Sequence, residues 1–452
     1  MIIRNVFIGF SLLIAGIATA QNYSSSPFSS QGIGEEGPLN DGQFSALGNA
    51  KSTVIDSIVV NTYNPASYAF LSKGQPLFAM GLSSRVSNYS LNNSTARGTI
   101  VGLSQIALVL PLNKRLGIAG GIQPFARKGY SLGTSSALSS DSVNYSYIGS
   151  GSVSKVFGGF SYKLIARKRQ DFAVGANIGY LFGGVSNERR AVLKSNAPAG
   201  AVDITTFRLH SMTYNFGGAY RLRLDDKGNK QFTVAGTFTP EQTYSANLDY
   251  GLFYGSDAGN QTTFDTLVPL VLDRSGTVTY PQSYSVGVNY TIRPNHEKLQ
   301  LKNPFQLAFF LDYSATSWKN YSTTFTEVTA PSYANATTLN VGFEYIPVVQ
   351  NAVSMSGFKG FVSQIRYRVG GYTATLPYSI NSRQVNENAV SFGFGIPLSG
   401  NKTNSSVNIS MLYGKRGTGT ATDISESFYS INIGIVLAPS SYERWFKKYK
   451  LD

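Results

Sequence analysis

The sequence predicts an all-β fold, a 14-stranded antiparallel transmembrane β-barrel. Fourteen stretches alternate apolar residues with small or polar ones, and a short apolar segment of the secretory type precedes them. Because successive strand side chains point to opposite faces, each stretch has one face suited to lipid and one mixed face. After the first twenty residues, no apolar run is long enough for a membrane-spanning helix. Backbone groups in lipid must be paired within the protein, so a closed barrel is the spanning structure that remains.

The first 20 residues predict a cleavable signal peptide. Arg4 is followed by the apolar run 6–17 and then by Ala18-Thr19-Ala20, which is the order of a basic region, an apolar core and a small-residue cleavage site. A retained anchor is the alternative, but the run is shorter than the roughly 20 residues that span a bilayer. We expect a mature chain that begins at Gln21 and lies in the outer membrane of a Gram-negative cell. The sequence has no cysteine, which excludes disulfides and a lipidated cysteine.

The predicted strands share a period of two. The last one shows it most clearly, because Tyr429, Ile431 and Ile433 fall on one face while Ser430 and Asn432 fall on the other. The even number of strands suits a bacterial barrel with both chain ends in the periplasm. We expect strands at 76–91, 99–112, 116–132, 143–164, 172–185, 204–224, 232–249, 277–292, 304–318, 337–349, 361–376, 388–398, 405–413 and 425–437.

The connections alternate in length, as in an up-and-down barrel. We expect periplasmic turns at the short links and outward loops at the longer links rich in Ser, Thr, Asn and Gly, the longest at 250–276. Charged residues are only 14% of the chain, and the net charge of +14 comes mostly from the periplasmic turns and the tail. Solvated turns explain this charge, and contact with anionic lipid headgroups or a periplasmic partner is the sharper alternative. The short links are 112–115, 166–171, 225–230 and 399–404.

Residues 21–74 lack the strand pattern and precede the first strand. A barrel of eight strands already fills its interior with side chains, so a barrel of fourteen leaves a lumen. The sequence therefore predicts a hatch, or plug, in that lumen. The resulting organisation is a signal peptide at 1–20, a hatch at 21–74, a transmembrane barrel at 75–438 and a periplasmic tail at 439–452.

Within the predicted hatch, the run SALGNAKSTVIDSIVVNTYNPASYAFL at 45–71 contains the triplet Asn64-Pro65-Ala66. This run, placed before fourteen strands, resembles the hatch of the FadL-like long-chain fatty acid transporters of the outer membrane. The resemblance implies a channel for fatty-acid-like molecules, with a hatch and a kinked third strand that opens the wall sideways. The tail PSSYERWFKKYKLD resembles those of Bacteroidetes-type members. The alternative is a non-transporting barrel that serves as a subunit or docking protein of an outer-membrane secretion or assembly complex.

The third strand carries the candidate opening. Pro124 follows Gly120 and Gly121, and proline cannot donate a ladder hydrogen bond, so it marks a bulge or a strand end. We interpret these residues as the wall kink; the alternative is that Pro124 lies above the membrane. On the inner face, the guanidinium forks of Arg366 and Arg368 are candidates to bind a ligand carboxylate. The plainer interpretation is that they hydrate the wall or anchor the hatch.

Catalytic motifs are missing from the sequence. Only His210 and His296 occur, far apart, and there is no metalloprotease, nucleophile-elbow or phosphate-loop motif. The run at 149–159 has dinucleotide-fingerprint spacing, but it lies in a barrel strand without a βαβ unit. We expect no enzyme activity, cofactor, metal or nucleic-acid partner. The expected partners are outer-membrane lipid, a hydrophobic small-molecule ligand, the barrel-assembly machinery during insertion and, under the alternative, other outer-membrane proteins.

Overall fold

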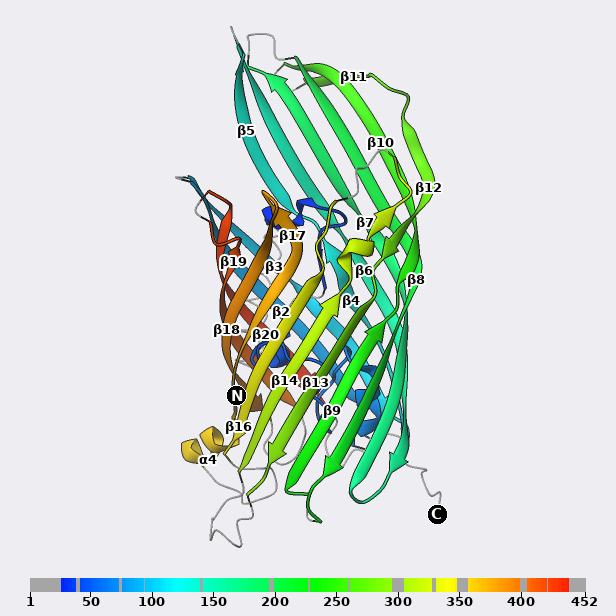
Figure 1. The fold of residues 1–452 in the computed structure, drawn as a ribbon, viewed down its shortest axis with the longest axis vertical. Coiled ribbons are helices and arrows are strands. Elements are labelled where there is room, and N and C mark those ends of the chain that lie inside the picture. The colour runs from blue at the N-terminus through cyan, green and yellow to red at the C-terminus, as the bar shows by residue number, and fades with distance from the viewer. Residues whose placement is uncertain are drawn as a thin grey trace.

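The wall of the molecule is one antiparallel sheet that closes on itself. The computed structural model describes residues 26–37, 41–72, 75–92, 94–138, 141–194, 199–226, 228–258, 261–294, 305–326, 331–347, 357–398, 405–420 and 422–438. Within them, fourteen strands form the ring, and the last pairs with the first, with Ile433 opposite Leu82. This confirms the predicted barrel (Figure 1). In ring order the strands are β2 (Leu77–Leu91), β3 (Ser94–Pro111), β4 (Leu116–Arg127), β6 (Asp141–Ala166), β7 (Gln170–Leu193), β8 (Ala199–Arg223), β9 (Lys230–Thr239), β13 (Ser283–Ile292), β14 (Gln306–Thr316), β16 (Ala336–Ile346), β17 (Arg366–Ile380), β18 (Arg383–Pro397), β19 (Ser406–Gly417) and β20 (Ser425–Leu437).

The two faces of the wall follow the predicted alternation. In β20, Tyr429 and Ile431 are exposed on the outside, whereas Ser430 and Asn432 are buried on the inside. The exposed apolar side chains continue around the ring, as a lipid-facing surface requires. The predicted signal peptide, the tail at 439–452 and the turn at 399–404 lie outside the described residues.

Placing a charge on the lipid face tests this register. Ile433 shares the outward face of β20 with Ile431, so Ile433→Asp would put a carboxylate against lipid. We expect a loss of about 2 kcal/mol or more near the midplane, seen as a reduced heat-modifiable folded band in cold gel electrophoresis. Ser425→Asp, at the exposed outer end of the same strand, should fold normally. Normal folding of the Ile433 variant would mean that the faces are reversed.

On one side the wall rises far beyond the membrane. Strands β6, β7 and β8 contain 26, 24 and 25 residues, whereas a tilted strand crosses a bilayer in about 9–11. Figure 1 shows their outer halves continuing upward as a tall sheet. The predicted loop at 250–276 was wrong, because backbone pairing outside the membrane makes most of it strand. The added strands are β5 (Tyr130–Leu138), β10 (Gln242–Ala258), β11 (Gln261–Thr266), β12 (Val271–Tyr280) and β15 (Ser322–Thr323), and η3 (Trp318–Asn320) precedes β15.

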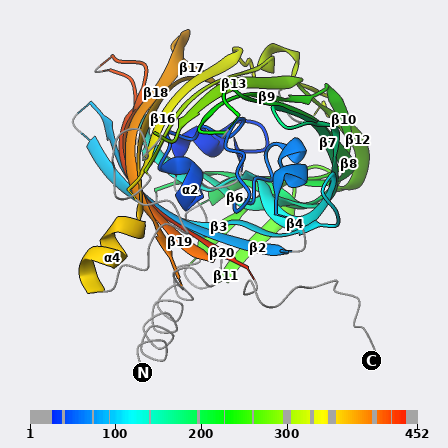
Figure 2. The same ribbon diagram turned by 90° about the horizontal axis from the view of Figure 1, so that it is seen from below.

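A short helix stands where the sequence predicted the beginning of a strand. Strand 361–376 was wrong in its first residues, because α4 (Gly357–Gln364) precedes β17. Exposed Phe358 and Phe361 are three residues apart, a helical spacing, and the Tyr367 hydroxyl donates a hydrogen bond to the Val362 carbonyl oxygen (3.1 Å). Figure 2 shows α4 outside the ring. No helix in the described ranges has the length and hydropathy needed to cross a membrane.

The N-terminal segment, residues 26–37 and 41–72, lies inside the ring. Figure 2, seen along the barrel, shows this blue segment surrounded by the wall strands. Its residues are mostly buried, and its helical turns contact strands on both sides of the lumen. The segment consists of η1 (Pro27–Ser30), β1 (Glu35–Glu36), α2 (Gly42–Ser45) and η2 (Pro65–Phe70), joined by turns.

Candidate functional site

One wall carboxylate holds a turn of the N-terminal segment. Asp312 of β14 accepts hydrogen bonds from the backbone N–H groups of Lys51 and Ser52, both at 2.6 Å, and from the Thr53 hydroxyl at 2.8 Å. The opposite residue on β13 is Gly287, where a Cβ would lie 1.9 Å from an Asp312 carboxylate oxygen. The glycine therefore leaves the space that this carboxylate occupies.

Glycines on the inner wall allow the segment to approach the strands at backbone distance. A Cβ added to Gly370 of β17 would lie 2.2 Å from the backbone nitrogen of Gly48. On the other side of the lumen, a Cβ on Gly175 of β7 would lie 2.6 Å from the carbonyl group of Pro65. Side chains larger than hydrogen at these positions would displace the segment.

The predicted triplet begins the helical turn η2. The Asn64 side chain accepts a hydrogen bond from the backbone N–H of Ala66 (3.1 Å) and donates one to the Ser52 carbonyl oxygen (2.9 Å), so it caps the turn as asparagine commonly does. Pro65 occupies the first position, where its missing N–H costs no hydrogen bond. The triplet packs on β7 and β8, where a Cβ on Gly175 would meet Pro65 and a Cβ on Gly217 would meet the Asn64 side chain.

The two predicted arginines are paired with acids of this chain. Arg366 lies 3.4 Å from Asp56 of the N-terminal segment and 3.7 Å from Glu344. Arg368 is buried and donates to Glu344 and Asn408, both at 2.7 Å. Through Asp56, Arg366 ties the segment to the wall, in line with the anchoring interpretation. A contact of either guanidinium with a ligand carboxylate stays a prediction.

Removing the Asp312 carboxylate should loosen the segment. In Asp312→Ala, the two N–H groups and the hydroxyl lose their acceptor, and each unsatisfied buried group costs about 1–3 kcal/mol. We expect limited proteolysis of the detergent-solubilised protein to cut between residues 41 and 72 at least tenfold faster, since tenfold corresponds to about 1.4 kcal/mol. Asp226→Ala, in an exposed turn between β8 and β9 and paired with Arg169, should leave that rate unchanged. Equal rates in both variants would remove the anchoring role of Asp312.

The wall splits between β3 and β4. Their ladder ends at the pair Ile106 and Ile122, and Ile122 is only the seventh residue of β4. From there outward, β3 pairs with β2 and β4 pairs with β6 within the described part of the wall. Because a strand needs about 9–11 residues to cross the bilayer, the split begins below the outer membrane surface.

The predicted kink residues lie along this split. Gly120 and Gly121 are in the regularly paired part of β4, opposite Leu108 and Ala107 of β3. Pro124 lies two residues beyond the last β3 pair, and the register with β6 shifts between Pro124 and Ala126. The irregularity therefore coincides with the proline, as its missing ladder donor would lead one to expect.

The N-terminal segment covers the split from inside. The Thr62 hydroxyl donates a hydrogen bond to Gln105 Oε1 of β3 (2.7 Å) and lies 3.5 Å from Gln123 Oε1 of β4, so it bridges the two strands where they part. Further out, β1 pairs with the free edge of β4, with Glu35 opposite Arg127. The segment thus supplies partners that β3 no longer offers.

Buried charges fasten β1 to wall strands on the other side of the split. Arg416 of β19 contacts Glu35 and also Glu387 of β18. Arg85 of β2 pairs with Glu426 of β20 at 2.8 Å. Burial alone would raise the pKa of Glu35, but the positive charges of Arg416 and Arg85 outweigh burial and lower that pKa to about 2. Glu35 is therefore ionised at neutral pH and held electrostatically.

A cavity of about 630 Å³ lies against both the split and the N-terminal segment. Its lining includes Pro124 and Phe125 from the split, Tyr63 from the segment, and charged groups such as Lys155 and Arg127. Arg366 and Arg368 are not among the described residues that line it. The cavity therefore offers both apolar and polar walls to a small molecule.

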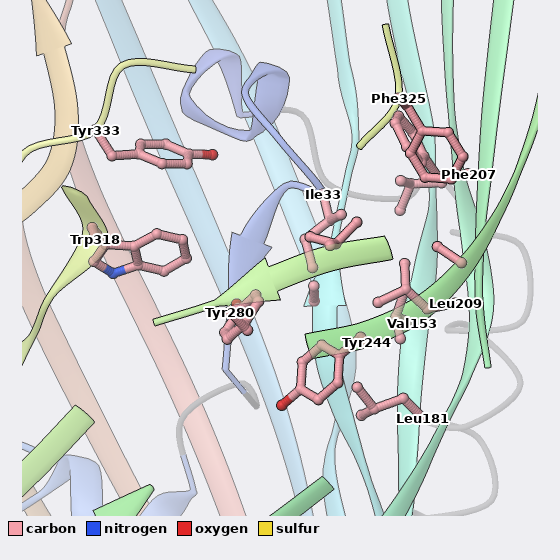
Figure 3. Packing of buried hydrophobic residues seen from close by; sticks show 14 of the residues in the cluster. Ile33, Val153, Leu181, Phe207, Leu209, Tyr244, Tyr280, Trp318, Phe325 and Tyr333 are labelled. Carbon is pink, nitrogen blue, oxygen red and sulfur yellow. The ribbon is translucent and has the colours of Figure 1, made fainter. Parts of the chain in front are cut away.

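Above this cavity, aromatic and aliphatic side chains fill the outer half of the lumen. Tyr280, Trp318 and Tyr333 form edge-to-face contacts, with ring centroids 5.4 and 4.9 Å apart. Ile33 of the N-terminal segment packs among them (Figure 3). We call this group the outer apolar cluster. Its described members are Phe28, Ile33, Tyr89, Ala126, Val153, Leu181, Val185, Phe207, Leu209, Tyr244, Ala246, Leu248, Val278, Tyr280, Trp318, Phe325, Tyr333, Tyr378 and Val385.

Sequence reasoning did not identify Thr62, Asp312 as the anchor, or the outer apolar cluster. Asp312 could be placed on the inner face, but its partners are about 260 residues away in the chain. The cluster combines residues from many strands, so no local pattern marks it. Among the described residues, no group of three His, Cys, Asp or Glu side chains could hold a metal ion.

These features, a closed 14-strand barrel with a split third strand and a chain segment inside, give the fold of a FadL-like β-barrel. The protein-family model BamG matches residues 1–452, and the chain belongs to the BamG family.

Solved structures share the fold at low sequence identity. The Pseudomonas aeruginosa FadL homologue is 12% identical, with a TM-score of 0.52 over 89% of this chain and 99% of its own. The toluene transporter TbuX of Ralstonia pickettii is 13% identical, with a TM-score of 0.52 over 88% and 98%. The toluene transporter TodX of P. putida is 15% identical, with a TM-score of 0.51 over 89% and 99%. No curated protein sequence gives a significant match.

Proposed function

We propose that this protein is an outer-membrane channel that takes up small hydrophobic, fatty-acid-like molecules and releases them through the wall split between β3 and β4. The observation that carries the proposal is the cavity, because one and the same cavity is lined by Tyr280 of the outer apolar cluster and by Pro124 at the split. A molecule in that cavity would touch both an apolar entrance and a break in the wall.

The route has three steps. The outer apolar cluster takes the hydrophobic molecule out of water, since burial gains roughly 25 cal/mol per Å² of apolar surface. The cavity then holds it, with Lys155 and Arg127 available to a carboxylate headgroup. Movement of Thr62 away from Gln123 then opens the split toward the lipid at the point where β3 and β4 separate. The segment that carries Thr62 acts in this route as the hatch.

The compartment follows from the same proposal. We propose that residues 1–20 are removed and that the mature protein begins at Gln21 in the outer membrane of a Gram-negative cell, after insertion by the barrel-assembly machinery. N-terminal sequencing of the protein from isolated outer membranes checks this. A terminus at Met1, or recovery from the soluble periplasm, would contradict it.

The test is mass spectrometry of small molecules that co-purify with the protein from native membranes. We expect monocarboxylic or neutral hydrophobic molecules at close to one per barrel, which are lost when bulky side chains fill the cavity, as in Thr237→Trp. The matched control is Val286→Trp on the lipid face of β13, which should keep the molecule. Equal recovery from both variants would place the molecule outside the cavity and contradict the proposal.

A second candidate function is favoured by the tall extracellular sheet. Leu270, Leu272 and Tyr254 are large apolar side chains exposed on it, with Leu272 68% exposed. The strand pairing shows how far from the membrane these side chains lie. Val271 pairs with Tyr250, and Tyr250 pairs with Thr205 of β8. Thr205 is 18 residues from the periplasmic end of β8, beyond the 9–11 residues that cross the membrane. An apolar patch in water suits a protein partner.

The alternative is therefore a barrel subunit or docking protein of an outer-membrane complex. Mild extraction followed by size-exclusion chromatography separates the two candidates. A docking role predicts other outer-membrane proteins at fixed stoichiometry, lost in a Leu270→Ser/Leu272→Ser variant and kept in Leu311→Ser on the lipid face. A channel role alone predicts the same elution for all three proteins.

A further inference from the structure

A polar row crosses the outward face of five neighbouring strands. Arg97 of β3 is opposite Asn88 of β2, Asn88 is opposite Ser427 of β20, Ser427 is opposite Lys415 of β19, and Lys415 is opposite Asn388 of β18. All five residues line one open groove of about 990 Å³. The pairing places their side chains side by side on the face that looks away from the lumen.

The row lies at the outer membrane surface. Ser427 is 10 residues from the periplasmic end of β20, and Lys415 is 9 residues from that of β19, so the row stands where a strand of about 9–11 residues leaves the bilayer. Two residues below it on the same strands are Tyr413 and Tyr429, exposed rings with centroids 4.9 Å apart. Aromatic girdles of this kind mark the interface of a barrel.

The charge of the row is positive. Arg97 and Lys415 are exposed, and no ion pair of either is present among the described residues. The nearby carboxylates, Glu387 and Glu426, are buried on the inner face of the wall and are paired with Arg416 and Arg85. Glu426 and Arg416 also line the groove, where this pairing leaves no free acid. The outward face at this level therefore offers two cations without a compensating acid.

The spacing separates the two cations. Three strand intervals of about 4.8 Å place the backbones of Arg97 and Lys415 roughly 14 Å apart. A single phosphate is too small to contact both Arg97 and Lys415 closely, whereas a headgroup that carries two phosphates can contact one with each phosphate. Between them, the amides of Asn88 and Asn388 and the hydroxyl of Ser427 can donate and accept hydrogen bonds with sugar hydroxyls.

We propose that this row binds the headgroup of a phosphorylated glycolipid of the outer leaflet. Arg97 and Lys415 each hold one phosphate by charge-assisted hydrogen bonds, and the polar side chains between them meet the sugar. The acyl chains lie along Tyr413 and Tyr429 and continue onto the lipid-facing wall. This binding site is separate from the lumen and independent of the proposed transport.

The test is native mass spectrometry of the whole protein in detergent with added diphosphoryl lipid A. We expect the wild-type protein to bind one molecule tightly. In Arg97→Ser/Lys415→Asn we expect the affinity to fall about tenfold or more, since a hydrogen bond to a charged group contributes strongly to such a contact. The matched control is Lys194→Asn/Lys319→Ser, which removes two exposed outer cations elsewhere on the molecule. The heat-modifiable band confirms that both variants fold.

Each other outcome contradicts the proposal. Equal loss in the control pair would mean that general charge attracts the lipid. Equal binding of lipid A without phosphates would remove the role of the cations. Equal competition by phosphatidylglycerol would indicate an unspecific anionic lipid surface rather than a glycolipid site.

Discussion

Deleting residues 21–74 should turn a tight barrel into an open pore. Fourteen strands enclose a lumen too wide for wall side chains to fill, and in the structure residues 26–37 and 41–72 occupy it. In planar bilayers with potassium chloride, we expect the deletion variant to show discrete open-channel conductance steps, and the complete mature chain to show none under the same conditions. A tight barrel after the deletion would mean that this segment is not the hatch.

A milder variant keeps this result interpretable if the deletion impairs folding. Gly370→Leu places a side chain where the Gly48 backbone now lies, so the segment must shift. Gly158→Leu on β6 adds the same side chain where nothing lies within 4 Å. We expect conductance steps from the first variant and none from the second, with both folded by gel shift. If neither variant shows conductance steps, the segment can be displaced without opening the lumen.

The sequence predicted the wall well because membrane strands obey a local rule. Each outward residue must suit lipid, and each inward residue is free to be small or polar, so a period of two is visible without any knowledge of neighbours. Where the wall leaves the membrane, lipid no longer imposes this rule. The pairing of Tyr250 with Val271 and Thr205 joins residues far apart in the chain, so no local pattern predicts it. Composition alone indicated a loop there.

The lumen was predictable by residue type but not by contact. Arg366 and Arg368 were expected on the inner face, and their ion pairs with buried Glu344 lie there. The contact of Arg366 with Asp56 depends on how the N-terminal segment folds back into the ring, which the sequence does not encode locally. The split was likewise predictable only in part. Pro124 indicated which strand is irregular, but no sequence signal indicated that the pairing of β3 with β4 ends at Ile106.

The wall split gives the second large effect. If Pro124 keeps the exit open, Pro124→Val should narrow it, because valine restores a backbone N–H and favours extended strand. We expect the initial rate of oleate uptake into proteoliposomes to fall about tenfold, equivalent to about 1.4 kcal/mol in the barrier. Folding should be unchanged, since the register of β4 with β6 already extends past this residue to Arg127.

Because the chain has no cysteine, the same exit can be blocked chemically. Pro124→Cys modified with a bulky maleimide should lower oleate uptake further than Pro124→Val, while Val286→Cys on the exposed lipid face of β13, modified in the same way, should leave uptake at the unmodified rate. The deletion and the blocked exit then act in opposite directions, one opening the lumen to ions and the other closing it to hydrophobic molecules. Unchanged oleate uptake in both Pro124 variants would remove the lateral exit and leave release through the periplasmic end of the barrel.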